Sequence, residues 1–139
     1  MLPGNEPGTI TGGTGGEIGL GISYDDVTNI LNLTNVGWGS SQGFTDLSSL
    51  ANNTHIHGAT AANNGAGFTQ TAGVLVTLTR SSNAVTGGTF TNPLVDLDTV
   101  FGVTAEAREA ELLAGRWYIN LHTANNGGGE IRGFFCARA

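Results

Sequence analysis

All three histidines of the chain lie in two short segments whose residue pattern is typical of β-strands. His55 and His57 stand on either side of Ile56, and His122 lies in the second segment, residues 118–123. Because alternate side chains of an extended strand point to the same face, His55 and His57 share one face and Ile56 points to the other. If the two strands lie close together, three imidazoles can converge on one point, which is what a copper or zinc ion requires.

The ligand type narrows the choice of metal. Three imidazoles without a cysteine ligand suit Cu(II), Zn(II) or Ni(II), and Cu(II) binds nitrogen ligands most tightly in the divalent series. The only methionine is Met1, so a thioether-rich Cu(I) site is not expected. We therefore predict that His55, His57 and His122 bind copper, with zinc as the alternative. Since only neutral imidazole binds a metal, binding should weaken below a pH of about 6.5.

Three further polar residues could support this site from neighbouring positions. Glu130 and Arg132 share one face of a strand expected over residues 130–136, and Asn120 shares the face of His122. A hairpin in simple register would set Asn120 opposite Arg132. It would also set His122 opposite Glu130, which could then take a fourth coordination position in place of water or orient the ligands. The alternative is a cross-strand polar ladder that locks the hairpin, with histidines that only hydrogen-bond across strands.

Other candidate residues are better explained by structural roles. The aspartates at 25–26 and 96–98 lack a full set of oxygen ligands for calcium, so turn and cap roles are expected. Trp38 and Tyr118 could stack on sugars, but isolated aromatic residues of β-proteins usually belong to the core. Cys136, the only cysteine, is expected to be a small packed residue and can form no internal disulfide. No nucleophile elbow, phosphate-binding loop or Cys-x-x-Cys motif supports a hydrolase or a nucleotide site.

Composition limits the classes of partner. The chain has no lysine, and its five arginines are outnumbered by eleven carboxylates, which gives a net charge of −6. This balance argues against nucleic acid or an anionic membrane surface as the main partner and fits attraction of cations. No apolar run is long enough to span a membrane, and the first residues lack the pattern of a signal peptide. We expect either a cytosolic protein or one whose signal has been removed.

The pattern of apolar residues predicts an all-β protein. Residues 1–16 are rich in glycine, proline and threonine and are expected to be a flexible lead-in, followed by one β domain over residues 17–139. About seven or eight short strands separated by turn residues, together with one short helix, indicate an antiparallel, Greek-key-like β-sandwich or barrel. A chain of 139 residues can bury such a core without disulfides.

Two local predictions are specific enough to be checked. Alternation over residues 18–22 and 28–36 predicts a hairpin that turns at the aspartate pair. A helix is predicted over residues 104–114, because Thr104 can cap its first turn and Gly115 stands where a helix usually ends.

Two motifs give the chain a family resemblance. Residues 118–123 (Tyr-Ile-Asn-Leu-His-Thr) and 129–133 (Gly-Glu-Ile-Arg-Gly) resemble the "YVNVHT" and "GEIRG" segments of the CHRD domain, which is named after chordin. Residues 54–58 (Thr-His-Ile-His-Gly) are similar to the "AHIHG" segment of that family, and the resemblance covers roughly residues 15–136. Ala59 departs from the family by replacing a proline, and the loop before residue 129 also lacks one. The resemblance implies a β-rich extracytoplasmic domain.

The His-x-His segment is also similar to the copper-binding strand of copper–zinc superoxide dismutases, which are Greek-key β-barrels. Taken together, the motifs predict a secreted or periplasmic copper-binding protein with a role in copper storage, delivery or redox chemistry. Two alternatives stay open. One is a non-catalytic extracellular module with structural histidines that binds a protein partner through its loops, and the other is a structural coat or adhesion domain.

Overall fold

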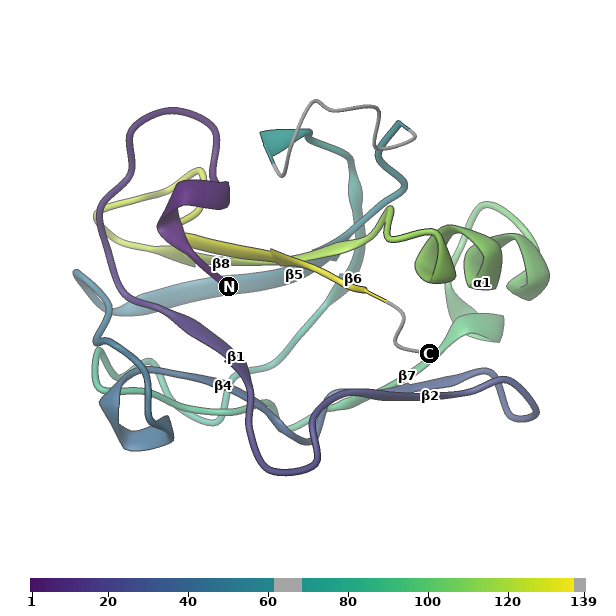
Figure 1. Cartoon of the computed structure of the whole chain (residues 1–139), viewed down its shortest axis with the longest axis horizontal. Coiled ribbons are helices and arrows are strands. Elements are labelled where there is room, and N and C mark those ends of the chain that lie inside the picture. The colour runs from purple at the N-terminus through teal and green to yellow at the C-terminus, as the bar shows by residue number, and fades with distance from the viewer. Residues whose placement is uncertain (62–68, 137–139) are drawn as a thin grey trace.

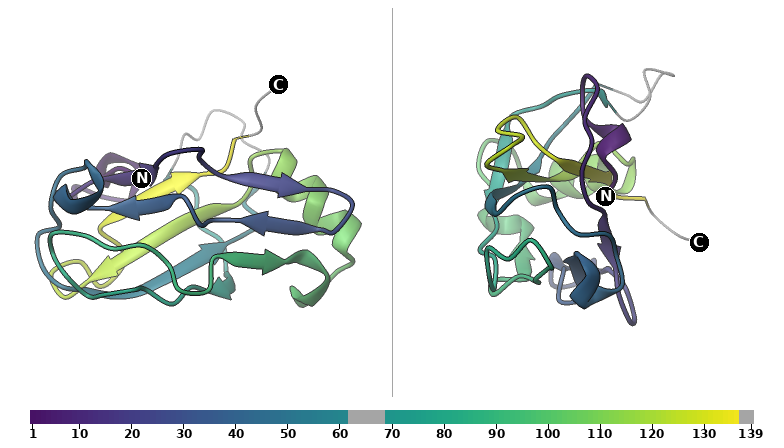
Figure 2. Two further views of the ribbon diagram at one scale, coloured as in Figure 1. Left: turned by 90° about the horizontal axis from the view of Figure 1, so that it is seen from below. Right: turned by 90° about the vertical axis from the view of Figure 1, so that its left-hand side faces the viewer.

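Two layers of antiparallel strands face each other in the computed structural model, which describes residues 1–61 and 69–136 (Figure 1). The four-stranded layer has the order β6 (Val74–Thr77), β5 (Ala51–His57), β8 (Tyr118–Thr123) and β9 (Ile131–Phe134). The second layer contains a sheet of β2 (Ser23–Asp25), β3 (Ile30–Asn32) and β7 (Leu94–Asp96), and a pair of β1 (Gly15–Glu17) and β4 (Val36–Trp38). Helix α1 (Ala105–Leu113) lies at one end of the two layers (Figures 1 and 2).

The fold class expected from the sequence is confirmed. The described residues form nine short strands, all paired antiparallel, and one α-helix. None of the described sheets closes on itself, so the architecture is a sandwich rather than a barrel. The part of the chain that the structure describes also contains three short 3-10 helices: η1 (Pro3–Asn5), η2 (Ser40–Gln42) and η4 (Leu97–Thr99).

The core lies between the layers and is made of alternate residues from each strand. Ile56 of β5 and Leu121 of β8 point inward from the four-stranded sheet and are fully buried. Trp38 of β4 and Leu31 of β3 meet them from the second layer, and Trp38 packs against Phe90 with ring centroids 6.0 Å apart. Since this burial removes large apolar side chains from water, it fixes which face of each strand points outward.

Helix α1 begins and ends as the sequence indicates. The Thr104 hydroxyl accepts a hydrogen bond from the Ala107 backbone N–H at 3.3 Å, which is an N-cap. Gly115, with a φ of +71°, has the left-handed backbone that ends the helix. Leu112 faces the core, while Leu113 is exposed. No helix among the described residues is long and apolar enough to cross a membrane.

The predicted hairpin is shifted along the chain. β2 does pair with β3, so a hairpin is present, but residues 18–22 form a turn instead of its first strand. The reason is the backbone of Gly19 and Gly21, whose φ angles of +53° and +76° interrupt an extended chain. The expected turn role of Asp25 is confirmed, because its carboxylate accepts hydrogen bonds from the backbone of Val27 and Thr28.

The structural roles predicted for the other candidate residues are confirmed, except that of Cys136. Asp96 caps η4 by accepting a hydrogen bond from the Asp98 backbone, and Trp38 and Tyr118 are buried as expected. Cys136 was expected to be packed, but it is exposed because it follows the end of β9 and leaves the sheet.

The N-terminal segment lies against the four-stranded sheet. Leu2 forms an isolated bridge with Arg132, with backbone hydrogen bonds of 2.9 and 3.2 Å in the two directions. Four residues later the Glu6 carboxylate pairs with the Arg132 guanidinium at 3.2 Å, and the two side chains are only 1% and 2% exposed. The flexible lead-in over residues 1–16 stays a prediction, and within it Leu2 and Glu6 both contact Arg132.

Glu130 joins three parts of the chain that are distant in sequence. Its buried carboxylate accepts hydrogen bonds from the Ser48 hydroxyl and backbone, the Gly13 backbone at 3.0 Å and the Thr123 hydroxyl at 2.9 Å. A side chain at Gly12 would overlap the Glu130 side chain, since an added Cβ would clash with its Cγ and its carboxylate. The loops on this side of the molecule thus depend on one buried negative charge.

Replacing Glu130 with glutamine should lower the free energy of unfolding by about 2–4 kcal/mol at pH 7, because a neutral amide accepts these bonds poorly. Burial alone would raise the pKa of Glu130, but the hydrogen bonds from Ser48, Gly13 and Thr123 outweigh it and hold the pKa below the ordinary value of 4.5. The stability they contribute is therefore present above pH 4.5 and lost as the pH falls further.

Urea unfolding at pH 7 and at about pH 3.5 tests this. The difference between wild type and Glu130→Gln should shrink at the lower pH, while Glu106→Gln on the exposed side of α1 should change little at either pH. A difference that is equal at both pH values would contradict the assigned role.

Candidate metal centre

The pairing of β5 with β8 places the three histidines on one face of the four-stranded sheet. His55 lies opposite Asn120, and His57 shares its face two residues further along β5. His122 follows Asn120 by two residues on β8, so it occupies the same face and lies diagonally beside His55. Ile56, between the first two, points into the core. The shared face that the sequence predicted is thus present.

The three imidazoles are close enough to act together. The ring centroids of His55 and His122 are 5.2 Å apart, and those of His55 and His57 are 5.6 Å apart. One ring nitrogen from each histidine lies within 4.8 Å of the others, and each side chain is half-buried. Two metal–nitrogen bonds of about 2.0–2.1 Å span about 4 Å, so small rotations would bring all three nitrogens onto one ion.

Hydrogen bonds define which nitrogen two of the rings present. His57 donates from Nδ1 to the carbonyl oxygen of Ala72 at 2.8 Å, and His122 donates from Nδ1 to the carbonyl of Gly127 at 2.8 Å. A carbonyl can only accept, so both Nδ1 atoms carry a proton, and in the neutral ring Nε2 is then the nitrogen that presents a lone pair. This backbone support of the far nitrogen is the usual arrangement behind a metal-binding histidine.

One buried nitrogen of each histidine ring has no hydrogen-bond partner among the described residues. His57 Nε2, His122 Nε2 and His55 Nδ1 are all buried and accept no hydrogen bond from the part of the chain that the structure describes. Burying an unsatisfied polar atom normally costs about 1–3 kcal/mol, so three of them at one point call for an explanation. A bound metal ion would satisfy all three.

The electrostatics of the site favour neutral rings. Burial lowers the pKa of His55 and of His57, and the neighbouring His122 lowers both further. Both pKa values therefore lie below the ordinary value of 6.5, and the rings are neutral at pH 7. Neutral imidazole is the form that binds a metal.

Tyr118 supports His57 in two ways. Its ring lies parallel to the His57 ring, with centroids 4.8 Å apart and an interplanar angle of 3°. Its hydroxyl accepts a hydrogen bond from the backbone N–H of Ala72 at 3.1 Å, and the Ala72 carbonyl is the group that holds His57 Nδ1. The guanidinium carbon of Arg132 lies 4.1 Å from the centre of the Tyr118 ring. The tyrosine therefore fixes the plane of the imidazole and the loop residue that orients it.

The three supporting residues predicted from the sequence lie in different surroundings. The predicted pairing of Asn120 with Arg132 is confirmed, and Arg132 reaches the site through its contact with Tyr118. Asn120 donates to the carbonyl of Gly128 in the loop after His122. The Glu130 carboxylate accepts hydrogen bonds from Ser48 and Thr123 and from no histidine among the described residues. No carboxylate or thiol of the described residues joins the histidine group.

Sequence reasoning missed the partners that hold the rings. Tyr118 could have been found, because it precedes Asn120 by two residues and must share its face. The carbonyls of Ala72 and Gly127 could not, since every residue carries a carbonyl and the loops themselves show no pattern.

Comparison with known proteins identifies one family. The family model of the CHRD domain matches residues 3–135, which is nearly the whole chain. No curated protein and no solved structure matches the chain.

Replacing Tyr118 with phenylalanine should keep the stacked ring but release Ala72. The Ala72 amide should then exchange its hydrogen about 2–10 times faster, the effect of losing one hydrogen bond, and the His57 Nδ1–H resonance should exchange faster as well. Hydrogen exchange and nitrogen NMR on metal-free protein measure both. Tyr24→Phe removes the other tyrosine hydroxyl of the chain, which contacts Asn29, and should leave these signals unchanged. Unchanged exchange at Ala72 in Tyr118→Phe would show that the hydroxyl does not hold the loop.

Proposed function

The chain belongs to the CHRD domain family, and from that premise we propose that it is a secreted copper-binding protein whose metal is held by His55, His57 and His122. The observation that carries the proposal is the set of three buried ring nitrogens that lack a partner among the described residues. Two of these rings are already oriented by backbone carbonyls, so little conformational freedom is lost when an ion binds.

Ligand chemistry supports copper as the metal. Three imidazoles form a nitrogen site, for which Cu(II) has the highest affinity among the divalent first-row ions, and zinc is the alternative. No cysteine of the described residues joins the histidine group, and the only methionine in the sequence is Met1, which argues against a Cu(I) site of the thiolate or thioether type. The negative net charge of the protein favours the approach of a cation.

Three protein ligands leave at least one coordination position for water or another small ligand, because Glu130 is engaged by Ser48 and Thr123. An open position suits a protein that exchanges its metal with a partner or carries out redox chemistry. We therefore propose copper storage, delivery or redox chemistry as the role of the site. Membership of the CHRD family supports a location outside the cytoplasm, and we propose the extracellular space or the periplasm.

A non-catalytic module for binding a protein partner is the second candidate. The observation that favours it is that His57 and His122 each hold a loop through a backbone carbonyl, which a structural histidine would also do. The two candidate functions differ at the Nε2 atoms of His57 and His122. A metal-binding protein uses these atoms as ligands, whereas a structural role leaves them without one.

Copper titration of metal-free protein separates the two. Wild type should bind one equivalent of Cu(II) saturably and show a visible d–d absorption band. His57→Ala should lose more affinity than the roughly 10- to 100-fold that follows loss of a partner behind a ligand. Asn53→Ala is the matched control, because Asn53 lies on β5 opposite His122 but offers no imidazole. It should bind copper as wild type does.

The same titration can also contradict metal binding. Folded wild-type protein that binds neither copper nor zinc saturably would leave the histidines with a structural role. The search would then turn to protein partners of the loops at residues 72 and 127.

A further inference from the structure

A second candidate site lies between the two layers, on the opposite side of β8 from the histidines. A cavity of about 650 Å³ opens between β2, β9 and α1. Ile119 of β8 lines it and points to the inner face, whereas its neighbours Tyr118 and Asn120 point to the outer face with the histidines. The volume is within the range of about 300–1,000 Å³ that is typical of small-molecule sites.

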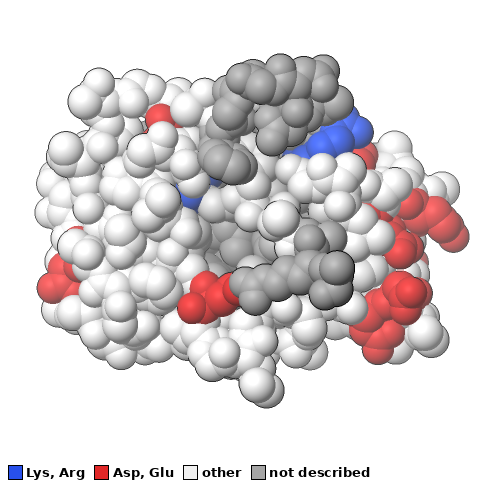
Figure 3. All heavy atoms as spheres, viewed as in Figure 1, with Lys and Arg blue, Asp and Glu red and all other residues white. Residues whose placement is uncertain are grey.

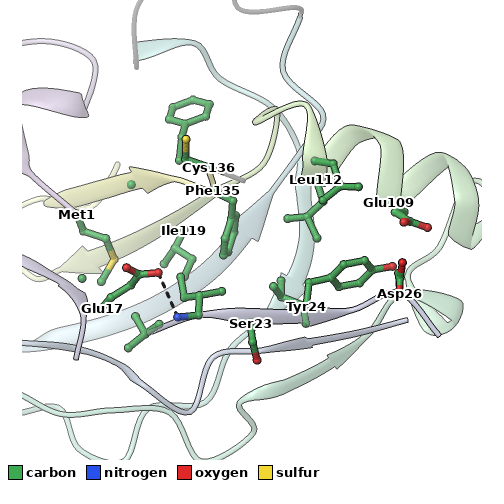
Figure 4. A pocket seen from close by; sticks show the side chains of 17 residues that line it. Met1, Glu17, Ser23, Tyr24, Asp26, Glu109, Leu112, Ile119, Phe135 and Cys136 are labelled. Carbon is green, nitrogen blue, oxygen red and sulfur yellow. Dashed lines mark hydrogen bonds between the residues drawn. The ribbon is translucent and has the colours of Figure 1, made fainter. Parts of the chain in front are cut away.

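The floor of this cavity is apolar. Figure 4 shows Ile119 from β8, Phe135 after β9 and Leu112 from α1 projecting toward one another. Leu31 of β3 also lines the cavity, and all four side chains belong to the core. The cavity is therefore a place where the sandwich core can be reached from solvent, and an apolar group bound there would be shielded from water.

One end of the cavity is acidic. The Tyr24 hydroxyl points toward the carboxylates of Asp26 and Glu109 (Figure 4). Burial raises the pKa of Tyr24, and the negative charges of Glu109 and Asp26 raise it further, so both charges act at this end. Acidic side chains gather on the same side of the molecule, at the end that contains α1 (Figure 3).

The opposite end of the cavity carries less negative charge. Among the described residues that line it, Glu17 is the one carboxylate there, beside Met1, and it accepts a hydrogen bond from the backbone N–H of Ile22 at 3.1 Å. Two carboxylates attract a cation more strongly than one, so a bound cation is drawn toward Asp26 and Glu109.

We propose that this cavity binds a small hydrophobic amine, with its apolar body on the core side chains and its ammonium group between Asp26 and Glu109. Both parts of the ligand are needed. The apolar floor supplies burial, and the two carboxylates with the Tyr24 hydroxyl supply acceptors for an N–H donor. An anionic ligand of the same shape would face two negative charges. The proposal does not depend on the histidine site, which lies on the other face of the sheet.

Three probes with one indole ring test the charge requirement on the metal-free chain of 139 residues: tryptamine, which is cationic, tryptophol, which is neutral, and indole-3-acetate, which is anionic. Isothermal titration should rank their affinities in that order. Amide chemical shifts should move at the residues lining the cavity, including Leu112 and Tyr24, and not at the histidines. His57→Ala should bind tryptamine as wild type does.

Two variants on α1 form a matched pair. Glu109→Gln should weaken tryptamine binding by about two- to five-fold, the effect of one partly exposed ion pair, and leave tryptophol unchanged. Glu106→Gln, on the exposed side of the same helix and outside the cavity lining, should change neither. Leu113→Trp fills the cavity from a position that is 49% exposed, so the fold should tolerate it and both ligands should lose binding.

Equal affinity for tryptamine and indole-3-acetate would overturn the proposal. Failure of all three probes to bind the folded wild type would do the same, and so would shifts confined to another surface. These outcomes say nothing about copper, so the two proposals fail separately.

Discussion

The register between β5 and β8 is the constraint on which the rest of the structure depends. It sets His55 opposite Asn120, so the histidines of both strands meet on the outer face while Ile56 enters the core. A shift of one residue would turn every side chain of a strand to the other face. It would bury imidazoles among apolar residues and expose the core. Hydrophobic burial on one face therefore determines the geometry of the polar cluster on the other.

Buried polar side chains hold together loops that contribute few apolar side chains to the core. Twenty-three glycines make the connections adaptable but give them few side chains to pack. Glu130 draws residues 13, 48 and 123 together, and Arg132 draws in Glu6 and the carbonyl of Gln70. Both side chains of this pair are almost fully buried, and burial raises the pKa of Glu6 to about 7 against the attraction of Arg132. The same loops supply the carbonyls that orient His57 and His122.

Much of the site could be predicted because its determinants are local. Strand alternation alone predicts that His55 and His57 share a face, and the capping pattern of Thr104 and Gly115 predicts α1. The partners of Glu130, in contrast, could not be predicted from local pattern. Gly129, with a φ of +129°, takes the chain out of the strand, so β9 begins at Ile131 and the carboxylate turns to Ser48. A partner 82 residues away in sequence leaves no periodic signal.

In the proposed site, three imidazoles bind one ion together. X-ray absorption spectroscopy of the protein loaded with one equivalent of copper tests this most directly, because multiple scattering from imidazole rings reports how many of them bind the metal. We predict three imidazole nitrogens at about 2.0 Å and no sulfur. A spectrum with one imidazole or none, or with a sulfur ligand, would contradict the account.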